Sequence, residues 1–562
     1  MKKILYYTVG GCLFLGLAYG SLYFYFQYKS SLPEKNIWTT ERVLPESLDM
    51  RSYLAGNYAR QKGLTDKALD SYLNVLKKDP KNTRLIQDVY LLAMIQGRPE
   101  SAEPYLESVS KENSNKFMVD YFQALQAIKL GKTEQALRLL EHKNKQAVDK
   151  ILIPLISSWI YAKQGNRPKA IQVLDKIKDP QFAFTKGYQR FLLGAYFNDS
   201  EIIQLGLLQM QGKRLPAIGY FPLVKKHTEK KQKWEKSDLF EQFQKTIKNY
   251  PATAELMVQK GEEKLTIESG LSESLYLISA DSGNGLLTKE EALFFNSLAL
   301  YLNPKKQLAL IWGAELSESL ELPHVCLQYF ERITPKNATL RFKQASVLVE
   351  LGKAEEALKI LNTLKKDNQE NVALLTLLGQ IYIDTNKKQE ALNIYNHLIN
   401  DLDLKLKNPE LSKLYLIRAN LNYDLNRTDN LLADLEKAHI LQPDDPMIQN
   451  DLGYHKLLHG QVAEGFDLIN QAYKQKPQDP YILDSLAFAY YQKQQYNAAL
   501  PFAEKALELM PQSALINMHL GDIYQGLGRH RESRFQYKKA LDLKVDLPKK
   551  FESKLLKQLS QN

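Results

Sequence analysis

The most regular hydrophobic pattern of the chain lies between Pro446 and Leu547, where three blocks of 34 residues follow one another. Each block carries two small residues twelve positions apart, namely Gly453 and Gly465, Ala487 and Ala499, and Gly521 and Ser533. This spacing predicts two helices that touch backbone to backbone. Pro477 and Pro511 end two of the blocks, because a proline ring without an N–H cannot continue a helix. Each block therefore predicts a helix–turn–helix that buries its apolar face by stacking on its neighbours.

Looser copies of this block extend over most of the chain. Gly56, Ala68, Tyr72 and Pro80 occupy the same relative positions near the beginning, and they predict four repeats over residues 49–184. Residues 185–305 keep a degenerate helical pattern, and clear repeats return over 306–547 with a short insertion at 403–411. Residues 548–562 predict a charged capping helix and a tail. Because no strand-like alternation of useful length occurs, the predicted fold is an all-α solenoid.

A long apolar segment precedes the repeats. Lys2 and Lys3 are followed by an uncharged run from Ile4 to Tyr28, which at about 1.5 Å per residue can span a bilayer core of about 30 Å. We therefore expect a transmembrane signal anchor at 1–30 and a polar linker at 31–48, with the N-terminus in the cytoplasm. Two alternatives stay open: a signal peptide cleaved after small residues near Gly20, and a lipoprotein that uses Cys12.

The anchor segment also carries a motif for helix association. Gly16 and Gly20 form a GxxxG pattern, which lets two membrane helices approach closely. This pattern predicts a homodimer through Gly16 and Gly20, although glycine is also common in membrane spans that do not associate.

The charge of the chain indicates its partners only weakly. The sequence has 75 basic and 64 acidic residues, a net charge of +11 that is mild for 562 residues and does not argue for nucleic acid. Lysines dominate one segment, 213–236, where Pro216 and Pro222 interrupt the helical pattern. This segment predicts a solvated surface, or a contact with anionic lipid headgroups or another anionic polymer, assisted by Phe221 and Trp234.

Motifs of catalysis and metal binding do not occur in the sequence. It lacks a phosphate-binding glycine loop, HExxH, a nucleophile elbow and any CxxC pair, so we expect no catalytic, cofactor or metal residues. His455 and His459 share a helix face, but no third ligand accompanies them, so we interpret both as structural or surface residues. His519 near Asp522 is interpreted as polar groove lining rather than as a catalytic dyad.

The first helix of each repeat is expected to line the concave face of the solenoid. Positions two, five, nine and twelve of each block then face a ligand. The candidate partner-binding residues at these positions are Asn420, Tyr423, Asn450, Tyr454, Asp484, Phe488, Tyr491, Met518 and Asp522. Tyrosine, methionine, asparagine and aspartate together suit an extended peptide or an amphipathic helix.

These repeats resemble the tetratricopeptide family. The runs 450–454, 479–486, 519–522 and 528–536, and a block that ends early at Pro335, are further similar to multi-repeat envelope proteins of alphaproteobacteria. The resemblance implies the solenoid fold and an exported location, and it transfers no biochemical activity. Phe488 and Tyr537 stand where that group often has tryptophan.

Together these features predict a non-enzymatic scaffold in the bacterial inner membrane, with its repeats in the periplasm, that binds protein or peptide partners. Cleavage of the N-terminal segment would instead release it into the periplasm. The alternative function is a helper in polysaccharide, peptidoglycan or outer-membrane assembly that binds glycan or lipid. An enzyme hidden in the degenerate middle is disfavoured, because that segment shows no convergent nucleophile, base and charge stabiliser.

Overall fold

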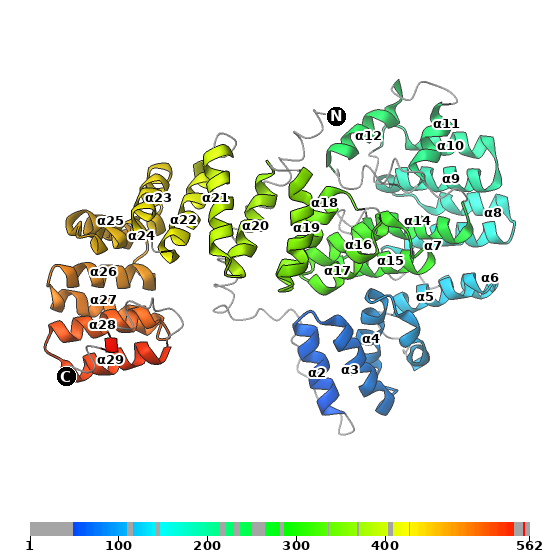
Figure 1. Ribbon diagram of the computed structural model, residues 1–562. Coiled ribbons are helices and arrows are strands. Elements are labelled where there is room, and N and C mark those ends of the chain that lie inside the picture. Colours follow the sequence, from blue (N-terminus) through cyan, green and yellow to red (C-terminus); the bar gives the residue numbers. More distant parts are fainter. Residues whose placement is uncertain are drawn as a thin grey trace. The chain divides into compact units, whose positions relative to one another are not determined.

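The computed structural model describes residues 49–108, 116–141, 147–213, 218, 220–229, 236–249, 265–280, 286–334, 336–367, 370–402, 408–425, 427–543 and 555–556. Every regular element in these ranges is a helix, as the sequence predicts (Figure 1). Within the same ranges no helix combines the length and the apolarity that a bilayer crossing requires. The predicted anchor at 1–30, including Gly16 and Gly20, and the linker at 31–48 lie outside the described residues.

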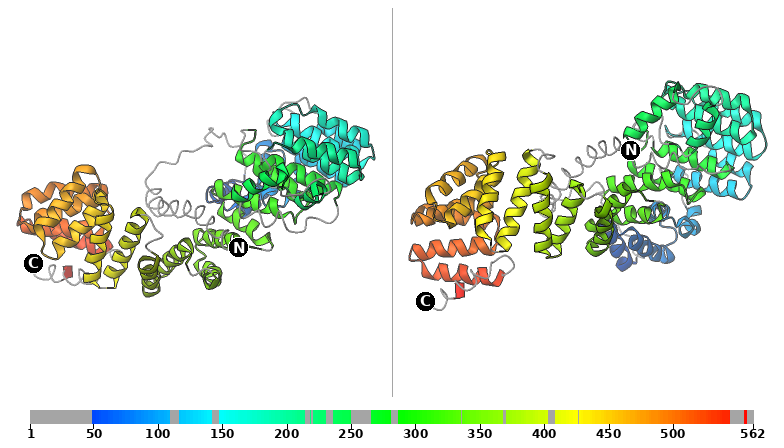
Figure 2. Two further views of the ribbon diagram at one scale, coloured as in Figure 1. Left: turned by 90° about the horizontal axis from the view of Figure 1, so that it is seen from above. Right: turned by 45° about the horizontal axis from the view of Figure 1, so that its top comes forward.

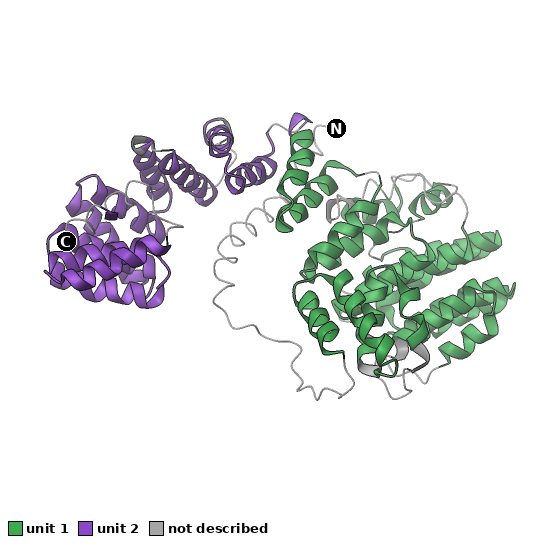
Figure 3. Cartoon of the chain, turned by 60° about the horizontal axis from the view of Figure 1, so that its bottom comes forward, with its two compact units in different colours: residues 1–364 green, residues 365–562 purple. Residues whose placement is uncertain are grey.

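The chain forms two compact units, unit 1 at residues 1–364 and unit 2 at residues 365–562 (Figure 3). The division falls inside the predicted repeat segment 306–547, so the repeats at 306–364 belong with the N-terminal ones. The helices at the start of this segment pack in series onto those before them, residues 307–319 on 289–302 and residues 323–332 on 307–319.

Unit 1 begins with four helix pairs. They comprise α2 (Met50–Gln61), α3 (Thr65–Lys78), α4 (Thr83–Ile95), η1 (Pro99–Ser101), η2 (Glu103–Ser108), α5 (Lys116–Lys129), α6 (Thr133–Leu140), α7 (Asp149–Lys163), α8 (Arg167–Gln172) and η3 (Val173–Lys176). The second member of the second pair, η1 and η2, is 3₁₀ rather than α-helical. Pro104 lies inside it and removes a backbone donor that a regular α-helix would use, whereas Pro99 is its first residue, where no such donor is needed.

The remainder of unit 1 continues with helices packed in sequence. They are η4 (Pro180–Phe182), α9 (Ala183–Phe197), α10 (Ser200–Met210), α11 (Phe221–Glu229), α12 (Asp238–Asn249), α14 (Ile267–Ala280), α15 (Lys289–Leu302), α16 (Gln307–Ser319), α17 (Pro323–Arg332), α18 (Ala338–Glu350) and α19 (Ala354–Asp367). The last of these, α19, crosses from unit 1 into unit 2. Pro222 lies in the first turn of α11, a position that tolerates proline, rather than interrupting the helix.

Unit 1 folds back on itself. Helices α14 and α15 pack against α7 and α4, the first helices of N-terminal pairs, more than 100 residues earlier in the chain (Figures 1 and 2). The ring of Tyr90 lies 5.9 Å from that of Phe294, and the ring of Tyr121 lies 5.6 Å from that of Phe295. All four rings are buried, so the inner face of these repeats is filled by the chain itself.

A small residue permits the closest of these contacts. Gly270 of α14 lies directly under the fully buried indole of Trp159 of α7, where a Cβ would approach ring carbons to within 2.2–2.6 Å. The indole Nε1 of Trp159 donates a hydrogen bond to Gln189 Oε1 at 3.0 Å, which fixes the orientation of the ring. Only glycine fits at position 270 in this arrangement.

The core of unit 1 also contains a buried ion pair. The carboxylate of Glu273 contacts the ammonium of Lys306, and their side chains are 0% and 6% exposed. The hydroxyl of Tyr188 donates to Glu273 Oε1 at 3.0 Å and accepts from the backbone N–H of Tyr220 at 3.2 Å. Burial raises the pKa of the Tyr188 hydroxyl well above its usual value, and the nearby charge of Glu273 adds to this.

Unit 2 consists of helix pairs in chain order. They are α20 (Val372–Asp384) with α21 (Lys388–Leu402), α22 (Asn408–Asp424) with α23 (Thr428–Leu441), α24 (Pro446–Leu458) with α25 (Val462–Gln475), α26 (Pro480–Gln492) with α27 (Tyr496–Leu509), and α28 (Ala514–Gly526) with α29 (His530–Leu543). Each helix contacts the next along the chain. Of the predicted capping segment 548–562, only residues 555–556 are described.

The 34-residue period is visible in how the first helices begin. Asp445 and Asp479 each accept hydrogen bonds from two backbone N–H groups of the following first turn, and Ser513 accepts one. These are the groups that a helix start leaves without a partner. Pro446 and Pro480 follow as first helical residues, where the missing N–H costs nothing.

The small residues of the sequence pattern lie where the two helices of a pair meet. A Cβ on Gly453 would approach the carbonyl oxygen of Gly465 to 2.8 Å, so these backbones touch as predicted. In other pairs the glycine receives a tyrosine ring from sixteen residues later: Gly56 with Tyr72, Gly313 with Tyr329, Gly379 with Tyr395, and Gly521 with Tyr537. Glycine therefore sets the distance between paired helices in both units.

Candidate partner-binding groove

The first helices of the last four pairs, α22, α24, α26 and α28, carry all the predicted groove residues. Asn420 and Tyr423 lie on α22; Asn450 and Tyr454 on α24; Asp484, Phe488 and Tyr491 on α26; and Met518 and Asp522 on α28. In addition to their own partners, α24 contacts α26, and α26 contacts α28. These first helices therefore stand side by side, and we call the face that they share the inner face of unit 2.

A continuous row of rings crosses this inner face. The ring of His455 lies 5.4 Å from Tyr423 and 5.6 Å from Tyr454. The ring of Tyr454 lies 5.4 Å from Phe488, and the ring of Phe488 stacks on His519 at 4.7 Å. The row therefore links α22, α24, α26 and α28 without interruption.

Tyr491 extends the same row on α26. Its ring stacks on Phe488 with the centroids 6.1 Å apart, and it lies 5.7 Å from Tyr496, the first residue of α27. The row therefore reaches the turn between α26 and α27. Stacked and edge-on rings at these separations each add about 0.5–1.5 kcal/mol beyond the burial of their area, so the row is a stiff surface.

Two aspartates accompany the rings. Asp484 Oδ2 accepts a hydrogen bond from His519 Nδ1 at 2.9 Å, and Asp522 Oδ1 accepts one from the hydroxyl of Tyr537 at 2.8 Å. The sequence placed His519 near Asp522, whereas in the structure its hydrogen bond goes to Asp484, 35 residues earlier. Asp484 lies on the neighbouring first helix, so this bond joins two repeats.

Two oxygen atoms on this face have no hydrogen-bond partner in the structure. They are Oδ1 of Asp484, whose residue is 5% exposed, and Oδ1 of Asn450, whose residue is 4% exposed. The amide nitrogen of Asn450 donates to Asp451 Oδ1 at 3.3 Å, which leaves its oxygen as an acceptor. A buried acceptor without a donor costs about 1–3 kcal/mol, so both atoms mark positions where a bound donor would be stabilised.

The electrostatics of the tyrosines are set by burial and by acidic neighbours. Burial raises the pKa of the Tyr454 hydroxyl above its usual value, and Asp484 and Asp522 raise it further. Burial, with Asp522 and Tyr496, likewise raises the pKa of Tyr491 to about 12. The charges that act on these two hydroxyls therefore come from the carboxylates of Asp484 and Asp522.

The predicted residues differ in how accessible they are. Asn420 is exposed, and Tyr423, Tyr454 and Tyr491 are half-buried, so these four can contact a partner directly. Asn450, Asp484, Phe488 and Asp522 are buried beneath or between them. Met518 is 1% exposed and packs with Tyr537, Ala540 and Leu555, so it contributes to the core at the end of unit 2.

Sequence reasoning missed the place of His455 in the ring row. The sequence pattern pairs His455 with His459 on one helix face, but in the structure the ring of His455 fills the gap between Tyr423 and Tyr454. His459 Nδ1 instead lies 2.7 Å from the carbonyl oxygen of His455. The place of His455 in the ring row could have been predicted from its position in the sequence, because His455 directly follows Tyr454, which occupies a groove position.

The other chemistry of the described residues is limited. No group of three or more His, Cys, Asp or Glu side chains is arranged in them to hold a metal ion. The thiol of Cys326 is buried, which raises its pKa well above the usual range. Phe221, proposed to assist lipid contact by the basic segment, is 2% exposed and stacks on Phe243 at 4.3 Å, so it belongs to the core; Trp234 lies outside the described residues.

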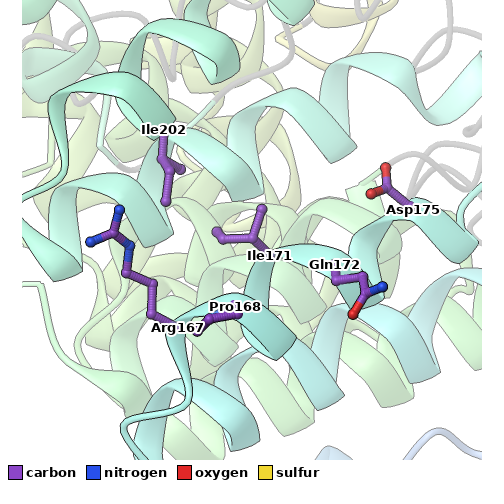
Figure 4. Close-up of a pocket in the computed structure, with 6 residues that line it drawn as sticks. All are labelled: Arg167, Pro168, Ile171, Gln172, Asp175 and Ile202. Atoms are coloured by element: carbon purple, nitrogen blue, oxygen red, sulfur yellow. The ribbon is translucent and has the colours of Figure 1, made fainter.

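An open depression lies between α8 and α10 in unit 1 (Figure 4). Its lining residues are Arg167, Pro168, Ile171, Gln172, Asp175 and Ile202. Arg167 forms an ion pair with Asp199, and Asp175 forms ion pairs with Arg190 and, at 3.1 Å, with Lys186. Its charged groups are therefore already paired within the chain, and we assign no function to it.

Paired helices in series, with an inner face of rings and carboxylates, define a class of helical-repeat interaction scaffolds. Comparison with family models gives the family. Models described as tetratricopeptide repeat match residues 342–400, 481–510 and 514–544. The chain therefore contains tetratricopeptide repeats at these residues. Such repeats bind protein or peptide partners and form scaffolds that are typically not catalytic.

Two curated relatives match parts of the chain. A TPR repeat-containing protein of Pseudomonas aeruginosa is 26% identical over 202 residues, which are 35% of this chain and 33% of that protein. The interferon-induced protein with tetratricopeptide repeats 2 of Cricetulus griseus is 28% identical over 131 residues, 23% of this chain and 27% of that protein. The chain thus matches about a third or less of the length of each relative.

Two solved structures illustrate the likeness of fold. A tetratricopeptide repeat protein from Parabacteroides merdae is 18% identical with a TM-score of 0.36, and the match covers 45% of this chain and 97% of that one. A chain of the APC/C hetero-tetramer Cut9-Hcn1 is 14% identical with a TM-score of 0.35, and the match covers 92% of this chain and 96% of that one.

Proposed function

We propose that the protein is a membrane-anchored scaffold of the bacterial envelope that holds an extended segment of a partner protein on the inner face of unit 2. The observation that carries this proposal is the uninterrupted ring row from Tyr423 to His519. Half-buried tyrosines supply large contact area at low entropic cost, which is why aromatic residues dominate binding surfaces.

The proposal also includes the predicted anchor. The uncharged run from Ile4 to Tyr28 after two lysines supports an inner-membrane span, with the repeats on the periplasmic side. Anchoring would confine the inner face to the membrane surface and raise its effective concentration toward other membrane proteins.

The groove part of the proposal is tested by site-specific photo-crosslinking in cells. A photo-reactive amino acid replaces Tyr491 in the full-length chain, and crosslinked partners are identified by mass spectrometry. The matched control places the same amino acid at Phe535 of α29, which is 66% exposed in the same unit but lies outside the ring row. We expect defined protein adducts from position 491 and not from position 535.

Failure would be equally clear. If neither position 491 nor position 454 captures a protein while position 535 does, the inner face of unit 2 is not the binding surface.

Anchoring is tested separately by comparing membrane fractions of the full-length chain with a version that lacks residues 1–30. Equal membrane association of the two versions would overturn the anchor. Adducts with glycan or lipid alone would favour the assembly-helper alternative.

A further inference from the structure

The ring row lies over acceptors that need donors. Oδ1 of Asp484 and Oδ1 of Asn450 are both buried without a partner, on adjacent first helices. Asp522 contributes a further carboxylate on the next first helix. A partner segment that supplied N–H groups or cations to Oδ1 of Asp484 and Oδ1 of Asn450 would remove the cost of leaving these two atoms unsatisfied.

The charge of the inner face of unit 2 determines which hydrogen-bond donors of a partner it favours. Tyr454 and Tyr491 border the aspartates, and the neighbouring charges that act on their hydroxyls are negative. A lysine or arginine side chain can contact the face of such a ring and reach a carboxylate beyond it, which combines a cation–π contact with a charge-assisted hydrogen bond. A glutamate or aspartate at the same place would face repulsion and the loss of its own hydration.

We propose that the inner face of unit 2 recognises an extended protein segment in which lysine or arginine alternates with apolar residues, with the basic side chain directed to Asp484 and the apolar ones to the ring row. This inference rests on the proposed function and specifies the chemistry of its partner. Four neighbouring helices about 10 Å apart span about 30 Å, which an extended segment of about nine residues covers.

Fluorescence anisotropy with the full-length chain tests the inference. The probes are labelled peptides of about 12 residues that share the same apolar residues and carry Lys, Gln or Glu at the alternating polar positions. We expect the Lys peptide to bind about tenfold more tightly than the Gln peptide, as one charge-assisted hydrogen bond predicts, and the Glu peptide to bind most weakly. The Lys preference should shrink when NaCl is raised from about 0.05 M to about 0.5 M.

A matched pair of variants locates the preference. Asp484→Asn keeps the shape of the side chain and removes its charge, so the Lys and Gln peptides should bind nearly equally. Asp467→Asn makes the same change at an exposed position of the second helix α25 and should leave the preference intact. Thermal unfolding of both variants verifies that they remain folded. If one variant does not fold, the salt dependence of the Lys preference in the unmodified chain still tests the inference.

The outcomes separate this inference from the function on which it rests. Equal binding of Lys and Gln peptides to the unmodified chain, or a Lys preference that survives in Asp484→Asn, overturns the inference. Protein adducts from Tyr491 would then still support the groove. Absence of binding by all three peptides overturns the inference as well, whereas the proposed function fails only if crosslinking at the ring row captures no protein.

Discussion

Replacing Gly270 by alanine tests whether unit 1 folds back on itself. A Cβ at this position lies 2.2 Å from Cζ2 and 2.3 Å from Cη2 of Trp159, far inside van der Waals contact. The indole is fully buried and held by its hydrogen bond to Gln189, so it cannot move aside without breaking that bond. Overpacking costs about 1–3 kcal/mol or more. The better helix propensity of alanine offsets about 1 kcal/mol of this cost, so we expect the local free energy of unfolding to fall by about 2 kcal/mol.

Hydrogen exchange measured by mass spectrometry resolves this loss along the chain. We expect peptides from α7 and α14 to exchange about thirtyfold faster, which corresponds to about 2 kcal/mol. Peptides from α26 and α28 should keep their rates, because unit 2 has its own core. Gly521→Ala is the matched control: its Cβ meets the ring of Tyr537 at 2.5 Å, so it should accelerate exchange in α28 and α29.

A second substitution tells a steric clash from a general loss of stability. Trp159→Phe removes the ring atoms that the new Cβ would strike, at a cost of about 2 kcal/mol for the lost packing and hydrogen bond. The double variant, Trp159→Phe with Gly270→Ala, should therefore lose clearly less stability than the sum of the losses measured for the two single variants. Strictly additive losses, or unchanged exchange in Gly270→Ala, would show that α7 and α14 do not pack as described.

Three further predictions concern buried charge and turn geometry. Lys306→Met leaves the carboxylate of Glu273 buried without its counter-charge, although Tyr188 still donates to it, and should cost about 3–5 kcal/mol in denaturant unfolding. Adding Glu273→Gln should recover most of this loss, and an unchanged unfolding midpoint in the single variant would contradict the prediction. Burial raises the pKa of Asp451 from 3.8 to about 6, so the folded chain holds this proton more tightly than the unfolded chain does. Its contribution to stability is therefore full at low pH and declines as the pH rises from about 4 to 6, and Asp451→Asn should remove that decline from thermal scans over this range. Gly460, between α24 and α25, has φ +80°, so Gly460→Ala should cost about 1 kcal/mol, and a midpoint equal to that of the unmodified chain would refute the strain argument.

The sequence predicted the repeated unit well because its signals are local. Small residues twelve positions apart mark the crossing of two helices, and the structure brings Gly453 against Gly465 there. Helix starts coincide with Asp445 and Asp479, and prolines follow the second helices. In the second pair Pro104 lies within the second element, which forms 3₁₀ turns, a local effect that the period alone does not reveal.

The return of α14 and α15 onto the N-terminal repeats could not be predicted in the same way. A repeat pattern describes packing between neighbours, whereas Gly270 contacts Trp159 across more than 100 residues. One signal was present in Ser269, Gly270, Ser272 and Ser274, a run of small residues in this helix. Ser272 Oγ donates to the carbonyl oxygen of Ala299 at 2.7 Å, which shows how closely the helices approach in this core.

For the candidate groove, the sequence placed residues on the correct helices but could not determine their depth. The nine predicted positions all lie on first helices, since the period fixes them. Whether a side chain at such a position reaches solvent depends on neighbouring repeats: Met518 is covered by Tyr537 and Leu555, while Tyr491 stays half-buried. The bond from His519 to Asp484 likewise joins two repeats and has no signature within either one.

The two units use the same helix pair for opposite purposes, and this determines where binding should occur. In unit 1 the rings of Tyr90 and Tyr121 on first helices are buried against rings of α15, so their area stabilises the fold and is not available to a partner. In unit 2 the tyrosines of the ring row remain half-buried above acceptors without donors. A surface that keeps both apolar area and unsatisfied acceptors gains most from an added chain segment. Partner binding should therefore respond to Tyr454 and Tyr491 and be insensitive to the inner face of unit 1, except through stability.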